Sequence, residues 1–122
     1  MDIRRVVPDV ASDKPEESRE FYTNVLGFDL AMDMGWIMTF VSPTQPTAQI
    51  NVLRGDASAP VSPAFSVEVA DVDAIHAIVV ARRLEIVHPL TTEPWGVRRF
   101  FVRDPNGMVI NVMQHSNPGG AR

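Results

Sequence analysis

The sequence predicts an α+β protein made of two consecutive modules, each with the order strand, helix, strand, strand, strand. Short runs with period-two alternation or many β-branched residues indicate strands, and two longer stretches carry apolar residues three and four positions apart, as helices do. The order of these elements repeats after a linker. The letters repeat as well, since Ile50-Asn51-Val52 recurs as Ile110-Asn111-Val112 and Val10-Ala11 recurs as Val69-Ala70.

The first module begins with a strand over residues 4–11, in which Pro8 indicates an edge position or a place where no hydrogen-bond donor is required. A helix follows, because residues 12–17 combine cap-forming side chains, a proline near the first position and carboxylates in the first turn. Gly27 is placed to end this helix. Its predicted apolar stripe is Phe21, Tyr22, Val25 and Leu26, and the predicted strands after it cover residues 28–34, 36–41 and 48–53.

The second module restarts the pattern after residues 54–63, whose small, polar and turn-forming residues indicate a linker. We expect a strand over residues 64–70 and then a helix capped by Asp71. The predicted remainder is an apolar stripe of Val72, Ile75, Ile78 and Val79, a strand over 84–87, and a β-hairpin over 99–114 with the turn Asp104-Pro-Asn-Gly107. We therefore expect one domain over residues 1–122, with module one at 1–55, the linker at 54–63, module two at 64–116 and a flexible tail at 117–122.

The composition excludes several kinds of functional site and several classes of partner. The 122 residues are 45% hydrophobic and include no cysteine, which excludes disulfides, thiolate metal sites and cysteine nucleophiles. A net charge of −4 argues against nucleic-acid binding, which needs a clustered basic face. No apolar run approaches the roughly 20 residues of a membrane helix, and the N-terminus lacks the apolar region of a signal peptide. We expect a cytoplasmic protein with no membrane partner.

Three local motifs carry a family resemblance. They are residues 17–28 (ESREFYTNVLGF), residues 67–73 (VEVADVD) and residues 101–107 (FVRDPNG). With the module order, they resemble the vicinal oxygen chelate superfamily, which holds glyoxalase I, extradiol dioxygenases and the fosfomycin- and bleomycin-resistance proteins. The resemblance implies a curved mixed sheet around a cleft between the modules. It does not imply one activity, because the fold hosts several chemistries.

The resemblance also predicts where a metal would be held. Metal-dependent members place ligands at four strand positions, which correspond here to Val7, Asn51, Ala64 and Asn111. None of these residues is His, Glu or Asp. Two amides supply no charge and too few donors for a catalytic divalent metal, so we expect no metal, no other cofactor and no catalytic residue.

Period-two alternation then predicts which side chains line the cleft. The resemblance points Arg99 and Phe101 inward and leaves Phe100 and Val102 for the core under the helix; the opposite assignment would exchange Phe101 for Phe100. The predicted ligand-binding residues are Val7, Asp9, Asn51, Ala64, Ser66, Glu68, Trp95, Arg99, Phe101, Asn111, Met113 and His115. Aromatic planes, one guanidinium and a few amides suit a small aromatic or amphipathic molecule.

Plainer interpretations remain open for the same residues. Trp36, Trp95, Phe100 and Phe101 can be ordinary core residues, and Arg99 can pair with Glu68 or Asp9 to satisfy a buried charge. The three histidines, His76, His88 and His115, lack the i, i+4 spacing of a helical metal site, and each is interpreted as a surface or packing residue. His115 is the exception to test, since it shares a strand face with Asn111 and Met113.

The sequence thus favours a metal-free binding protein that sequesters or senses its ligand, as drug-sequestering resistance proteins do. One alternative is a metal-dependent lyase or dioxygenase of the same superfamily with an unusual metal site at His115 or Glu68. Separately, Asp9 and Glu68 could face each other as an acid–base pair. A third interpretation is a dimerising or regulatory domain whose cleft is filled by its own side chains. The resemblance also implies a homodimer. The linker is long enough for the two modules to pair within one chain or to be exchanged between the two chains of the dimer.

Overall fold

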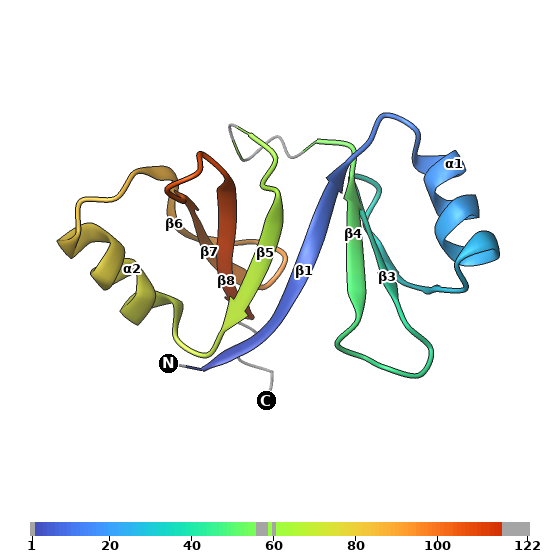
Figure 1. The fold of residues 1–122 in the computed structure, drawn as a ribbon, viewed down its shortest axis with the longest axis horizontal. Coiled ribbons are helices and arrows are strands. Elements are labelled where there is room, and N and C mark those ends of the chain that lie inside the picture. Colours follow the sequence, from blue (N-terminus) through green and yellow to red (C-terminus); the bar gives the residue numbers. More distant parts are fainter. Residues whose placement is uncertain (1, 56–58, 60, 116–122) are drawn as a thin grey trace. The chain divides into compact units, whose positions relative to one another are not determined.

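The computed structural model describes residues 2–55, 59 and 61–115. It confirms two βαβββ modules (Figure 1). The elements of the first are β1 (Ile3–Ala11), α1 (Pro15–Glu20), the π-helical turn η1 (Phe21–Val25), β2 (Asp29–Asp33), β3 (Ile37–Val41) and β4 (Gln49–Leu53). Those of the second are β5 (Phe65–Val69), α2 (Val72–Ala81), β6 (Ile86–Glu93), β7 (Val97–Arg103) and β8 (Val109–His115).

The chain divides into two compact units, which are described separately below. The first unit is Val7–Ser62, and the second is Met1–Val6 together with Pro63–Arg122. Strand β1 therefore contributes its first residues to the second unit and its remaining residues to the first. Residues 56–58 and 60 of the predicted linker and the predicted tail at 117–122 lie outside the described residues.

In the first unit, the strands lie in the order β2-β3-β4-β1. β2, β3 and β4 are antiparallel neighbours, whereas β4 and β1 run parallel, as expected for strands joined through a helix. The core lies under the helical segment, where Tyr22 stacks on the fully buried Phe40 with ring centroids 5.3 Å apart. The other residues of this core are Phe28, Leu30, Met38, Ile50 and Val52.

The apolar stripe predicted for the first helix is wrong except at Tyr22. Phe21, Val25 and Leu26 are 47%, 66% and 54% exposed. The α-helix ends at Glu20 and continues as a π-helical turn, in which the N–H of Leu26 donates to the carbonyl of Phe21 at 3.1 Å. A wider turn breaks the 3.6-residue period on which the stripe depends. Gly27 follows the helix with φ +87°, as predicted for its end.

In the second unit, the strands lie in the order β5-β8-β7-β6, with the start of β1 beside β5. α2 covers one face, and Asp71 caps it by accepting a hydrogen bond from the N–H of Ala74 at 3.1 Å, as predicted. Phe100 is fully buried there and meets His76 edge to face. The core residues of this face are Val67, Val69, Val72, Ile75, Val79, Ile86, Leu90, Phe100, Val102, Ile110 and Val112. The face assignment of Phe100 and Val102 is therefore confirmed.

The predicted strand over residues 84–87 is too short, since β6 runs from Ile86 to Glu93. Pro89 obscured the second half, because proline cannot donate to a neighbouring strand. β6 tolerates it because it is the last strand of the order and is irregular, with register shifts on both sides of His88. This extension places Glu93 inside the sheet.

The hairpin turn forms as predicted. The Asp104 carboxylate accepts the backbone N–H groups of Asn106 and Met108 at 2.8 and 2.9 Å. These hydrogen bonds hold the pKa of Asp104 below its ordinary value. The register of β7 and β8 is thereby fixed from the turn upward.

No helix in the described part of the chain has both the length and the apolar character of a membrane span.

Candidate functional site

The candidate site lies on the face of the second-unit sheet that α2 does not cover, called here the open face. Because α2 packs on Phe100 and Val112, alternation places their strand neighbours Phe101 and Asn111 on the opposite side. The open face therefore combines polar side chains with buried apolar ones, and most of its residues are buried. Its predicted members are Ser66, Glu68, Arg99, Phe101, Asn111 and Met113.

A row of four residues crosses the open face at Asn111. The backbone register pairs Ser66 with Asn111, Asn111 with Phe101, and Phe101 with His88. The Asn111 amide Nδ2 donates to the Ser66 hydroxyl at 2.9 Å. The amide oxygen Oδ1 is buried and has no hydrogen-bond partner, and Asn111 as a whole is only 9% exposed. Such an acceptor costs free energy unless something binds it.

Glu93 holds a buried ion cluster at the other end of the open face. Its Oε2 accepts from Arg99 Nε at 2.8 Å and lies 3.0 Å from His88 Nε2, and all three side chains are buried. Aromatic rings surround the cation: the Arg99 guanidinium lies 5.1 Å from the Trp95 ring centroid and 5.0 Å from that of Phe101. The cluster fixes the guanidinium against two rings.

Glu68 organises the third polar group, on β5. It accepts from Arg5 of β1 and lies 2.9 Å from Nδ1 of His115 on β8. Burial raises the pKa of the Glu68 carboxyl, but the hydrogen bonds from His115 and Arg5 outweigh it and leave the pKa below the ordinary glutamate value. Glu68 is therefore an anion at neutral pH and ties the start of β1 to the sheet.

The first unit contains an equivalent row, formed by Asp9, Asn51 and Thr39. Asn51 Nδ2 donates to Asp9 Oδ1 at 2.9 Å, and Asn51 Oδ1 accepts from the Thr39 hydroxyl at 2.6 Å. Both ends of this amide are thus bonded. Since β3 and β7 hold the same place in their modules, Phe101 stands where Thr39 stands, and its ring has no donor for Asn111.

The remaining predicted residues occupy less informative places. Val7 is buried, and Ala64, just before β5, donates its N–H to the carbonyl of Val109 at 2.8 Å. Met113 is buried between Glu68 and Arg99 in the register, and His115 is exposed. The structure thus brings the second-unit residues onto neighbouring strands of one sheet.

The donor set does not fit a metal ion. Across residues 2–55, 59 and 61–115, no three His, Cys, Asp or Glu side chains are grouped so as to hold one. Glu68 and His115 pair with each other, and Glu93 pairs with Arg99, whose charge opposes a second cation. Pairs of one carboxylate and one imidazole supply too few ligands for the usual protein metal geometries.

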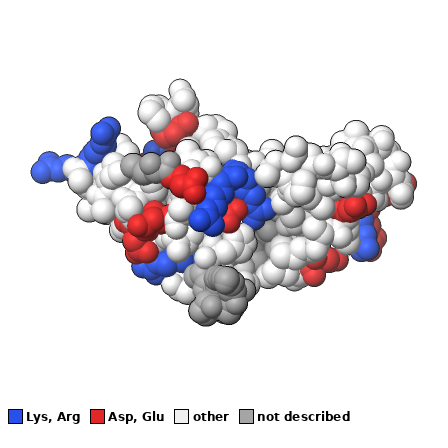
Figure 2. Space-filling view, turned by 90° about the horizontal axis from the view of Figure 1, so that it is seen from below, with Lys and Arg blue, Asp and Glu red and all other residues white. Residues whose placement is uncertain are grey.

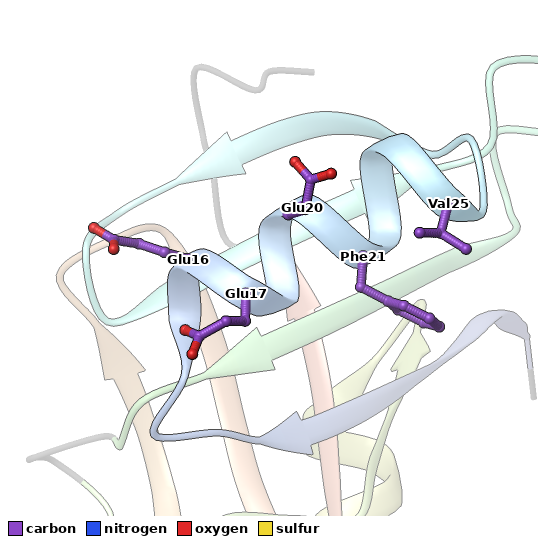
Figure 3. Close-up of a pocket in the computed structure, with 5 residues that line it drawn as sticks. All are labelled: Glu16, Glu17, Glu20, Phe21 and Val25. Carbon is purple, nitrogen blue, oxygen red and sulfur yellow. The ribbon is translucent and has the colours of Figure 1, made fainter.

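The first unit carries an open surface pocket along α1 and η1 (Figure 3). It is lined by Glu16, Glu17, Glu20, Phe21 and Val25, none of them buried. In Figure 3, Glu17, Phe21 and Val25 point to one side of the helical segment and Glu20 to the other. The pocket is an exposed apolar strip beside carboxylates and has no buried polar group to orient a ligand.

Elsewhere, several charged side chains pair with their opposites. Arg98 and Asp73 lie 2.8 Å apart, and the hydrogen bond from Arg98 lowers the Asp73 pKa. On the face shown in Figure 2, basic side chains lie next to acidic ones near the middle. This arrangement differs from the one-signed basic surface of nucleic-acid-binding proteins.

Sequence reasoning missed three contributors: Glu93, Thr39 and the buried state of His88. Glu93 was missed because the strand was ended before Pro89, whereas the alternation resumes after it. Thr39 was missed because its role depends on the register of β3 with β4, which the sequence alone does not supply. The only early signal was the repeated Ile-Asn-Val segment, which placed Asn51 and Asn111 at equivalent positions.

A family model described as Glyoxalase/Bleomycin resistance protein/Dioxygenase superfamily matches residues 3–112. The chain belongs to this superfamily. The resemblance seen in the three sequence motifs is therefore confirmed. No functionally curated protein matches this superfamily member.

Solved structures support the superfamily fold. A superfamily member from Vibrio splendidus 12B01 is 19% identical, covering 92% of this chain and 98% of its own, with a TM-score of 0.69. Methylmalonyl-CoA epimerase from Mycobacterium tuberculosis is 18% identical, covering 99% and 92%, with a TM-score of 0.71.

A protein described as NAD-dependent benzaldehyde dehydrogenase from Legionella pneumophila is 21% identical, covering 90% and 98%, with a TM-score of 0.71. At such identities these similarities establish the α+β fold of the superfamily, and the differing activities in the descriptions carry no assignment.

Proposed function

We propose that this superfamily member binds a small aromatic or amphipathic molecule and sequesters or senses it without a catalytic metal. One observation carries the proposal: the open face combines a buried amide with an unused acceptor, Asn111, and a guanidinium held against two aromatic rings. Rings supply contact area, and a few oriented polar groups supply specificity, which is the usual chemistry of small-molecule sites.

The proposed ligand contacts in the second unit are Ala64, Ser66, Glu68, Trp95, Arg99, Phe101, Asn111, Met113 and His115. Within this set, the rings of Trp95 and Phe101 would contact a planar group, and Asn111 would bind a polar one. The contributions of Val7, Asp9 and Asn51 stay predictions. Glu93 and His88 join the proposal as residues that hold Arg99 and Phe101 in place.

A dye-binding experiment on purified, metal-analysed protein tests this function. The probe is 8-anilino-1-naphthalenesulfonate, which is aromatic and amphipathic, added before and after treatment with EDTA. We expect saturable binding at one site per chain that EDTA leaves unchanged. Trp95→Ala should weaken the binding about tenfold, the effect of losing one good aromatic contact. The matched control is Trp36→Ala in the first unit, which should have no such effect.

Two results would contradict the proposal. Stoichiometric metal in the purified protein, with dye binding lost in EDTA, would favour the lyase or dioxygenase alternative, with Glu68 and His115 as the first ligands to test. Binding that is not saturable, or that Trp95→Ala leaves unchanged, would show that the open face is not the site. Circular dichroism of each variant checks that the dye reports on folded protein.

We also infer that the protein forms a homodimer in the cytoplasm. The exposed strip of Phe21, Val25 and Leu26, flanked by the carboxylates of α1, is the kind of apolar patch that marks a contact surface. The end of α2 offers a complement, where the exposed Val80 and Leu84 flank Arg82 and Arg83. A second copy of this chain would thus supply both apolar surface and opposite charge. Cell fractionation tests the location.

A further inference from the structure

The inference concerns the chemical class of the ligand, and it rests on the proposed function. In the first unit, the row across the sheet is closed: Thr39 donates to Asn51 Oδ1, and Asn51 Nδ2 donates to Asp9. In the second unit, the equivalent row lacks one hydrogen bond. Asn111 Nδ2 reaches Ser66, but the residue in the place of Thr39 is Phe101, and Asn111 Oδ1 is left without a donor.

We propose that the ligand supplies this missing donor: Asn111 Oδ1 accepts a hydrogen bond from an N–H or O–H group on a planar aromatic molecule. The donor group would take the place that the Thr39 hydroxyl takes in the first unit, and the ring plane would lie against Phe101. Phe101 contacts the His88 ring at a centroid distance of 5.0 Å and is fully buried, so its ring becomes accessible to a ligand only when neighbouring side chains separate. Ethers, esters and other molecules with acceptors only would bind poorly.

The environment favours a neutral or weakly basic donor. Arg99 lies close to Phe101, and its guanidinium is held by the Glu93 carboxylate. A full cation near Arg99 would be repelled, and Glu93 is already engaged with two partners. Aromatic amides, indoles, phenols and anilines satisfy these conditions, because each carries at least one N–H or O–H donor on or next to a planar aromatic ring.

Because Asn111 Oδ1 is shielded from solvent, neighbouring side chains must separate when the ligand binds. This requirement explains why an acceptor can remain unbonded in the free protein. A buried acceptor without a partner raises the free energy of that state, and a ligand that satisfies it recovers the difference as affinity.

The test compares indole with benzofuran, two molecules of nearly the same shape that differ in one ring N–H. Isothermal titration of the full chain should show indole binding at least about tenfold more tightly, because an unmade hydrogen bond to a buried group is costly. Asn111→Leu should bring the two affinities to within about twofold, and Asn111→Asp, which keeps an acceptor, should preserve the preference for indole. The control Asn24→Ala, at an exposed asparagine of η1, should keep the full difference.

The outcomes separate this inference from the proposed function. Equal affinities in the unsubstituted protein, with binding still dependent on Trp95, would overturn the donor class and leave the binding site standing. Tighter binding of benzofuran would show that the free amide atom is the nitrogen, and would also overturn it. Absence of binding by either probe, together with failure of the dye experiment, would remove the site itself. The comparison in unsubstituted protein does not depend on the folding of any variant.

Discussion

Asn51 and Asn111 hold equivalent places in the repeat but differ in their hydrogen bonding. The amide of Asn51 is bonded at both ends, to Asp9 and Thr39, and that of Asn111 at one end only, to Ser66. The repeat in the sequence placed both asparagines at equivalent positions, and the family resemblance predicts that these positions correspond to metal-ligand positions. The sequence could not supply their difference, since that depends on which side chain faces each amide from the next strand.

The two asparagines should therefore differ in their effect on stability. Asn51→Leu removes one partner each from Asp9 and Thr39 and should lower the free energy of unfolding by about 2 kcal/mol. Asn111→Leu loses one hydrogen bond but also removes the unbonded acceptor, so the change should stay below about 1 kcal/mol. Urea denaturation measures both. A loss at Asn111 as large as that at Asn51 would mean that its oxygen is satisfied in the folded protein.

Glu68 should make stability depend on acid pH. Its pKa is lower in the folded state than in the unfolded chain, because His115 and Arg5 bind the carboxylate. The stabilisation is therefore complete above the ordinary glutamate pKa and is lost as the pH falls through the folded pKa. Glu68→Gln should remove this part of the acid dependence in unfolding measured from pH 7 downward. Glu16→Gln, on the exposed face of α1, should leave the profile parallel to that of the original protein.

Strand β6 shows how one residue can hide half of an element. Proline is disfavoured in central strands, and the predicted strand ends before Pro89 for this reason. β6, however, is an edge strand with an irregular register, where proline is tolerated. Hydrophobic periodicity correctly predicted the other strands and the presence of both helices, but Ile78 of the stripe predicted for the second helix is 37% exposed. In the first helix, however, the π-helical turn shifted the stripe, because periodicity assumes regular geometry. Elements were thus predictable in kind and order, and less so where their geometry is irregular.

The extension of β6 should matter energetically, because it carries Glu93. Glu93→Ala leaves Arg99 and His88 buried without this carboxylate and should lower the free energy of unfolding by about 3 kcal/mol or more. The matched control is Glu85→Ala, which breaks another glutamate–arginine pair, Glu85 Oε1 to Arg103 Nε at 3.1 Å, at exposed side chains. That change should cost less than about 1 kcal/mol. Similar losses in thermal or urea unfolding would contradict the role of Glu93.

The whole molecule consists of two compact units, Val7–Ser62 and Met1–Val6 with Pro63–Arg122. The repeat and the family motifs were enough to predict both modules and the superfamily. Neither could predict the surfaces through which copies meet, because an exposed apolar strip looks like a buried one in the sequence. Phe21, Val25 and Leu26 form part of the apolar stripe predicted for the first helix, and their exposure is what suggests a second copy as their partner.

The proposed dimer can be tested by exchanging charge. The original protein should have twice the monomer mass in light scattering. Glu17→Arg with Glu20→Arg should give monomers, and so should Arg82→Glu with Arg83→Glu, because each places like charges across the contact. An equimolar mixture of the two variants should recover the dimer. A monomeric original protein, or a dimer unaffected by the arginine changes, would refute this contact.

Strand β1 pairs with two segments of the chain that are translated at different times. Its second half finds its partner on β4, with Asp9 bonded to Asn51 42 positions later. Its first half waits longer, because Arg5 pairs with Glu68, 63 positions away. At ribosomal rates of about 5–20 residues per second, the partner strands of the two halves of β1 are thus synthesised on the order of seconds apart. In the interval, the N-terminal segment of the nascent chain is an unpaired strand, open to chaperones.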